Sequence, residues 1–135
     1  MRRRFSLVLM TVVLLLTQGF VPCKAYAATG NYDFYPTTTG DTLDSHPVSK
    51  AGGPLYENCA YITPSYFSKN GAVDFWVEGN GVTTERINIS FGGVNVTRHP
   101  YYTSSAPTGG SYYVGGRVTT ISSGTSMRVK GAFTP

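Results

Sequence analysis

The sequence has few cysteines, no catalytic motif and little helical periodicity, and each shortage excludes a class of protein. Only two cysteines occur in 135 residues, at positions 23 and 59. A small domain held together by several disulfides is therefore excluded. Beyond residue 27, no stretch keeps apolar residues at helical spacing for three turns, which excludes a helical bundle.

The first 27 residues read as an export signal. Arg2, Arg3 and Arg4 precede an apolar run from Phe5 to Leu16, and Ala25-Tyr26-Ala27 supplies small residues before a cut at Ala28. This is the three-part layout of a cleavable secretory signal, in a form typical of bacteria. A spanning helix needs about 20 mostly apolar residues, more than this run provides. We therefore expect a secreted protein with no membrane anchor after cleavage.

Cleavage would also change the charge. The mature chain, residues 28–135, would keep seven of the 11 basic residues (11 − 4) and all seven acidic ones, so its net charge would be zero instead of +4. It contains no cluster of Lys or Arg. Because nucleic-acid binding requires a basic patch, a nucleic-acid partner is excluded.

The chain from residue 28 onward divides into two parts. Residues 28–54 have little periodicity and predict an irregular arm with one short strand near Tyr32–Tyr35. Residues 55–135 alternate apolar and polar side chains, as half-buried strands do. The strands are expected at about 55–62, 72–78, 83–91, 94–98, 111–121 and 126–133.

Glycine and asparagine fall between these runs, as tight hairpin turns require. The pattern predicts one all-β domain over residues 28–135: an antiparallel β-sandwich of six to eight short strands, behind an N-terminal signal helix. Gly115-Gly116, inside an expected strand, predicts a bulge or a crossing between sheets.

The most suggestive constellation is Asp74, Trp76 and Glu78. Alternation places them on the face opposite Val73 and Phe75, with a carboxylate on each side of the indole. An exposed ring flanked by acceptors suits stacking on a sugar. The alternative is a structural tryptophan whose strand is buried on both faces.

Two tyrosine pairs, Tyr101-Tyr102 and Tyr112-Tyr113, are further candidates. Neighbours on a strand point to opposite faces, so one ring of each pair is expected to be exposed. The first pair borders a polar loop, and such surfaces often bind ligands. The alternative is that tyrosine simply favours strands.

Metal binding and catalysis have weaker candidates. Asp41, Asp44 and His46 offer oxygen and nitrogen ligands for Ca²⁺, but their spacing does not match an acidic calcium loop, and we expect a solvated turn and no cofactor. Cys59 with His46 or His99 is the one nucleophile–base pairing on offer. A buried, inert thiol is the expectation for Cys59, with an intermolecular disulfide as the alternative.

These observations predict a secreted, non-catalytic module that binds an extracellular ligand, foremost a carbohydrate or cell-surface polymer. The expected contact residues are Trp76, Asp74, Glu78, Tyr101, Tyr102, Tyr112 and Tyr113. The alternative is a secreted protein-interaction factor, such as an inhibitor, a toxin or a surface-assembly subunit, that adds a partner strand to a free sheet edge. A small Cys-dependent hydrolase is the least favoured reading.

Overall fold

The computed structural model describes residues 28–51 and 58–135, and within them the protein is all-β with antiparallel sheets. The strands are β1 (Gly30–Phe34), β2 (Thr42–Leu43), β3 (Val48–Lys50), β4 (Tyr61–Phe67), β5 (Gly71–Gly79), β6 (Val82–Thr83), β7 (Ile87–Ser90), β8 (Gly109–Ile121) and β9 (Val129–Thr134), with a 3-10 turn η1 at Phe91–Gly93. The predicted signal helix at 1–27 lies outside the described residues.

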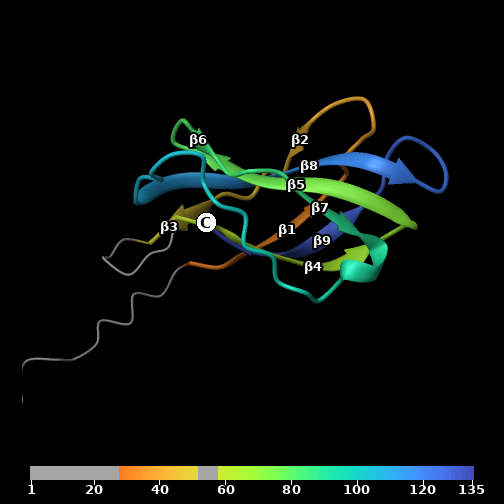
Figure 1. The fold of residues 1–135 in the computed structure, drawn as a ribbon, viewed down its shortest axis with the longest axis horizontal. Coiled ribbons are helices and arrows are strands. Elements are labelled where there is room, and N and C mark those ends of the chain that lie inside the picture. Colours follow the sequence, from red (N-terminus) through yellow and green to blue (C-terminus); the bar gives the residue numbers. More distant parts are fainter. Residues whose placement is uncertain (1–27, 52–57) are drawn as a thin grey trace, which may run out of the picture.

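Two sheets form two layers (Figure 1). The small sheet has the order β1-β9-β4. In the large sheet, β8 and β5 lie at the centre, β2 and β3 pair with β8, and β6 and β7 pair with β5. This layering is consistent with the predicted sandwich. The described residues hold nine strands instead of six to eight, because three pieces of two or three residues also pair.

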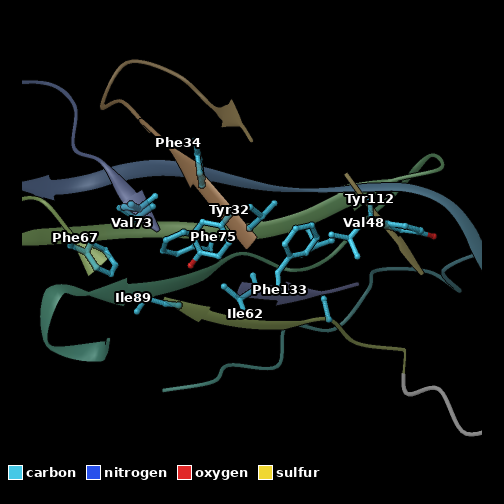
Figure 2. Close-up of a cluster of buried hydrophobic side chains, with 14 of the residues drawn as sticks. Tyr32, Phe34, Val48, Ile62, Phe67, Val73, Phe75, Ile89, Tyr112 and Phe133 are labelled. Carbon is cyan, nitrogen blue, oxygen red and sulfur yellow. The ribbon is translucent and has the colours of Figure 1, made fainter. Parts of the chain in front are cut away.

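The core lies between the layers (Figure 2). Alternation along β5 directs Val73, Phe75 and Val77 inward, and all three are fully buried. The small sheet contributes Tyr32 and Phe34 from β1 to the core. The centroid of the Tyr32 ring lies 5.9 Å from that of Phe75. Burying such side chains, each worth about 2 kcal/mol, is what holds the two layers together.

The N-terminal segment is not the irregular arm that the sequence predicted. The strand expected at Tyr32–Tyr35 is present as β1, but β2 and β3 are built into the large sheet as well. β1 pairs with β9 over five residues, and its side chains alternate between buried and exposed. Two large core rings come from this segment, so it is part of the domain and not an appendage.

Several predicted strands need correction. β5 and β8 are confirmed, but the expected strand at 83–91 is interrupted between β6 and β7, and residues 94–98 make only an isolated bridge through Arg98. Of the strand expected at 55–62, residues 55–57 lie outside the described residues, and β4 runs from Tyr61 to Phe67, beyond the predicted end at residue 62. Pro64 lies within it, and this is tolerated because β4 is at the edge of its sheet, where a missing N–H breaks no ladder bond.

The expected bulge at Gly115-Gly116 is wrong. β5 and β8 pair in unbroken register there, and the irregularity lies between Ala72 and Val73. The glycines are needed for close packing instead. A Cβ on Gly115 would meet the Trp76 ring, and one on Gly116 would lie 2.9 Å from Phe34.

Two short segments join the sheets along their sides. On one side, Thr38 N–H donates to Thr125 O, while Thr37 O accepts from Val118 N–H of β8. On the other, Tyr102 N–H donates to Asn58 O, and Thr103 N–H donates to Thr83 O of β6. Segments 36–38 and 101–103 therefore close the two flanks of the layered structure.

Candidate functional site

Trp76 lies on the outer face of the large sheet, as predicted, but it is not exposed. Only 2% of the residue is accessible. Its ring rests on Gly115, and the guanidinium carbon of Arg86 lies 4.0 Å above its centroid. The indole Nε1 donates to Glu78 Oε2 at 2.7 Å. The prediction that Trp76 is an exposed platform for a sugar is therefore wrong. The alternative, a structural tryptophan, describes the geometry.

Arg86 is held over the indole by Asp41. Both terminal nitrogens of the guanidinium donate to the Asp41 carboxylate. This hydrogen bonding lowers the pKa of Asp41 and raises the pKa of Arg86. Asp74 is also engaged, since Asn88 Nδ2 donates to its Oδ1 at 2.7 Å. We call Trp76, Arg86 and Asp41 the closed triad.

The tyrosine pairs alternate as predicted. Tyr101 is 60% exposed and Tyr102 is buried, while Tyr112 is buried and Tyr113 is half-buried. The buried members serve the core. The Tyr112 hydroxyl donates to Pro107 O at 2.6 Å, and the Tyr102 ring packs edge-on against Tyr112. Only Tyr101 is freely presented to a ligand, so the predicted contact residues do not form one surface.

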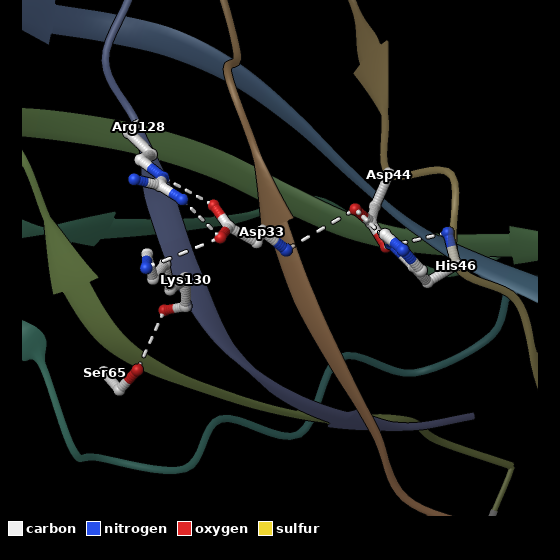
Figure 3. A network of polar contacts seen from close by, with 6 residues as sticks. All are labelled: Asp33, Asp44, His46, Ser65, Arg128 and Lys130. Carbon is white, nitrogen blue, oxygen red and sulfur yellow. Dashed lines mark hydrogen bonds and ion pairs between the residues drawn. The ribbon is translucent and has the colours of Figure 1, made fainter.

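The structure does not bring the metal candidates together. Asp41 pairs with Arg86, whereas the buried Asp44 accepts from the backbone N–H groups of His46 and Asp33 and contacts the His46 ring. Within residues 28–51 and 58–135, no three His, Cys, Asp or Glu side chains are grouped to hold an ion. Asp44 instead caps the turn between β2 and β3, where it accepts from His46 N–H. It also accepts from Asp33 N–H at the outer edge of β1 (Figure 3).

The nucleophile and base candidates lie in different surroundings. Cys59 is 2% exposed and its backbone bridges Tyr101. The ring of His99 lies 4.6 Å from that of Tyr61, and the ring of His46 contacts Asp44. Near Cys59, burial lowers the pKa of Lys50, whose ammonium lies 4.9 Å from the Tyr102 ring centroid.

A different surface gathers exposed aromatic and charged side chains. On the outer face of the small sheet, Tyr35 is 56% exposed and Tyr66 is 45% exposed. Arg128 and Lys130 belong to the central strand and its approach, between β1 and β4. Arg128 lies 5.7 Å from the Tyr35 centroid, and Lys130 lies 6.0 Å from the Tyr66 centroid. We call this surface the Tyr35–Tyr66 face.

Asp33 fixes the cations of this face. Arg128 Nε and Nη2 donate to the two Asp33 oxygens, both at 2.7 Å, and Lys130 Nζ lies 3.5 Å from Oδ2 (Figure 3). The hydrogen bond from Arg128 is the main reason that the pKa of Asp33 is lowered, and the same bond raises the pKa of Arg128. Bidentate pairing fixes the guanidinium plane, so the side chain is preorganised.

A shallow depression of about 410 Å³ extends from Lys130 along the same face. It is lined by Asn31, Tyr32, Asp33, Thr63, Ser65, Lys130, Gly131 and Ala132. Gly131 lies against the Tyr32 hydroxyl, where a Cβ would collide with it. Hydroxyl, amide and charged groups thus surround a hollow that lies beside two exposed rings.

Sequence reasoning missed this face for two reasons. Pro64 made residues 63–67 unlike a strand, and a register irregularity between Pro64 and Tyr66 places both Ser65 and Tyr66 in the open. One signal was available: Asn31, Asp33 and Tyr35 alternate with the buried Tyr32 and Phe34.

Comparison with protein-family models, curated proteins and solved structures finds no match to this chain. The described residues contain no helix that is long and apolar enough to cross a membrane. The functional argument therefore depends on the geometry of the molecule.

Proposed function

We propose that the protein is a secreted, non-catalytic binding module for an extracellular carbohydrate, and that the Tyr35–Tyr66 face is its contact surface. The observation that carries the proposal is the pair of exposed tyrosines on either side of a fixed arginine, next to a polar depression. Secretion is inferred from the signal pattern of residues 1–27.

The chemistry of the face suits a sugar polymer. Tyrosine rings offer flat apolar area at a low cost in conformational entropy and can stack on the C–H face of a sugar ring. Asn31, Thr63 and Ser65 supply side-chain hydrogen-bonding groups to the depression. Because the hollow is open and shallow, it favours a chain lying across the sheet over a small molecule enclosed in a pocket.

This proposal keeps the predicted ligand class and changes the residues. Trp76, Tyr102 and Tyr112 are buried, and Asp74 and Glu78 are hydrogen-bonded on the other sheet. Tyr35 and Tyr66 replace them as the expected contacts.

Protein interaction through a free sheet edge has less support. The edge of β4 is covered, since Ile62 and Arg98 exchange backbone hydrogen bonds and Pro64 O accepts from Asn95. The edge of β6 is paired with segment 101–103. A partner strand would have to displace these contacts before it could add at β4 or β6.

The test is a screen of plant, fungal and bacterial cell-surface glycans with the protein and with Tyr35→Ala and Tyr66→Ala variants. We expect each substitution to weaken binding of a captured glycan at least about fivefold, as loss of a central contact of roughly 1 kcal/mol would. Tyr101→Ala is the matched control, because Tyr101 is equally exposed but belongs to segment 101–103. Equal loss in all three variants, or loss only in the control, contradicts the assignment of the site.

A further inference from the structure

The Tyr35–Tyr66 face carries one more positive charge than negative. Along the described residues of its three strands and the approach to β9, the outward charged side chains are Asp33, Arg128 and Lys130. Asp33 is already satisfied by two short hydrogen bonds from Arg128. Lys130 shares the same carboxylate at the longer distance of 3.5 Å, so one aspartate faces two cations and the group keeps one net positive charge.

The unused donors point to the same kind of ligand. Arg128 donates through Nε and Nη2 to Asp33, and this leaves the two hydrogens of Nη1 for a further acceptor. The Lys130 ammonium has three donors, and it lines the depression together with the Asn31 amide. A group lying there would meet hydroxyl and amide partners along the hollow and a cation at its Lys130 end.

On the basis of the function proposed above, we infer that the glycan is acidic, and that a sugar carboxylate binds Lys130 beside Arg128. A neutral sugar would leave the one excess positive charge of the face unbalanced, whereas a uronate supplies one negative charge for each acidic unit along the chain. Charge complementarity of this kind selects among ligands that otherwise stack equally well on the tyrosines.

The experiment titrates the uniformly ¹⁵N-labelled protein with oligomers of three uronate-containing polysaccharides: polygalacturonate, alginate and hyaluronan. Each is compared with its methyl ester, which keeps the sugar chain and removes the charge. We expect at least one acid to shift the amide resonances of Lys130, Ser65 and Tyr66, and to bind several-fold more tightly than its ester. Its affinity should fall when NaCl is raised from 20 mM to 0.5 M, because exposed charges are screened.

Lys130→Gln is expected to weaken binding of the acid about threefold, the size of one partly exposed ion pair, and to leave ester binding unchanged. Arg117→Gln is the matched control. It removes the same net charge from the outer face of the large sheet, where Arg117 lies opposite Asp74. An equal loss in both variants would mean that overall charge, and not Lys130, attracts the polymer, and this overturns the inference.

Two further outcomes overturn the inference. If acid and ester bind equally at the tyrosines, the ligand is neutral and the proposed function survives without the acidic specificity. If none of the three acids binds, the acidic class is wrong, and the proposed function is decided separately by the neutral glycans of the screen and the Tyr66→Ala variant.

Discussion

Each outer face of the molecule combines an aromatic ring, an arginine near it and an aspartate that fixes the arginine, but the ring is buried on one face and exposed on the other. On the large sheet, Arg86 is fixed by Asp41 and lies 4.0 Å from the centroid of the Trp76 ring, and the ring is buried. On the small sheet, Arg128 is fixed by Asp33 but lies farther from its ring, and Tyr35 stays exposed.

The difference shows that an aromatic residue on the solvent side of a strand is not thereby a binding residue. The ring of Trp76 could be covered because Gly115 allows it to sink onto β8, and Arg86 then closes it from above. Tyr35 and Tyr66 are not sunk onto a neighbouring strand in this way, and both rings stay exposed. The ring of the closed triad is shielded from solvent, whereas the rings of the Tyr35–Tyr66 face are open to it.

The largest contrast is expected from removing one ring on each face. Trp76→Ala should lower the free energy of unfolding by about 3–5 kcal/mol, because a buried ring and its contacts are lost. Tyr66→Ala should change it by less than about 1 kcal/mol, since the ring is half exposed. Urea denaturation followed by far-UV circular dichroism measures both. Similar losses in the two variants would remove the distinction between the faces.

The close packing of Trp76 on Gly115 can be tested next. Gly115→Ala should cost about 1–3 kcal/mol, because the new Cβ would press into the indole. Gly92→Ala is the matched control, since a Cβ at that position meets no atom within 4 Å and its φ is not positive. The same denaturation experiment should place the control within about 0.5 kcal/mol of the parent protein.

Arg86→Ala should open the closed triad without unfolding the protein, at a cost of about 1 kcal/mol. We expect the tryptophan emission to shift to longer wavelength and iodide quenching to increase. Trp76 is the only tryptophan in the chain, so the signal reports on one site. Arg128→Ala, on the other sheet, should leave emission and quenching as they are. An unchanged spectrum in Arg86→Ala would show that Gly115 and Glu78 suffice to shield the ring.

The smallest effect concerns pH and should be alike on both faces. Arginine hydrogen bonds hold the pKa of Asp33 and Asp41 below the ordinary carboxyl value of about 3.9. Each pair therefore stabilises the fold above that value, and its contribution disappears as pH falls through the lower folded-state pKa.

Asp33→Asn and Asp41→Asn should each be slightly less stable than the parent at pH 6 and should converge with it in acid. Thermal denaturation between pH 2 and pH 6 measures the convergence. A gap that widens as pH falls would reverse the sign of the argument.

The alternation of apolar and polar side chains was enough to predict an all-β chain with antiparallel sheets, because β5 and β8 are long and regularly patterned. It failed where pairing is short or where a local rule is broken. β2 and β3 are too brief to show periodicity, and Pro64 concealed β4.

The candidate site was harder to predict, because exposure is a tertiary property. The sequence places Trp76 outward but does not reveal that Arg86, ten residues later, folds back over it. It likewise does not show that residues 35, 66 and 128 meet, because their proximity depends on the pairing of three strands.

The pairing of β1 with β9 has a consequence for the time at which the molecule can fold. The central strand of the small sheet is residues 129–134, and both of its neighbours precede it by more than 60 residues. A growing chain that has not yet reached those residues holds two strands without their shared partner, and long-range pairing of this kind is slow to form. Completion of the small sheet therefore waits until residues 129–134 have been made, even where the earlier strands of the large sheet can already pair.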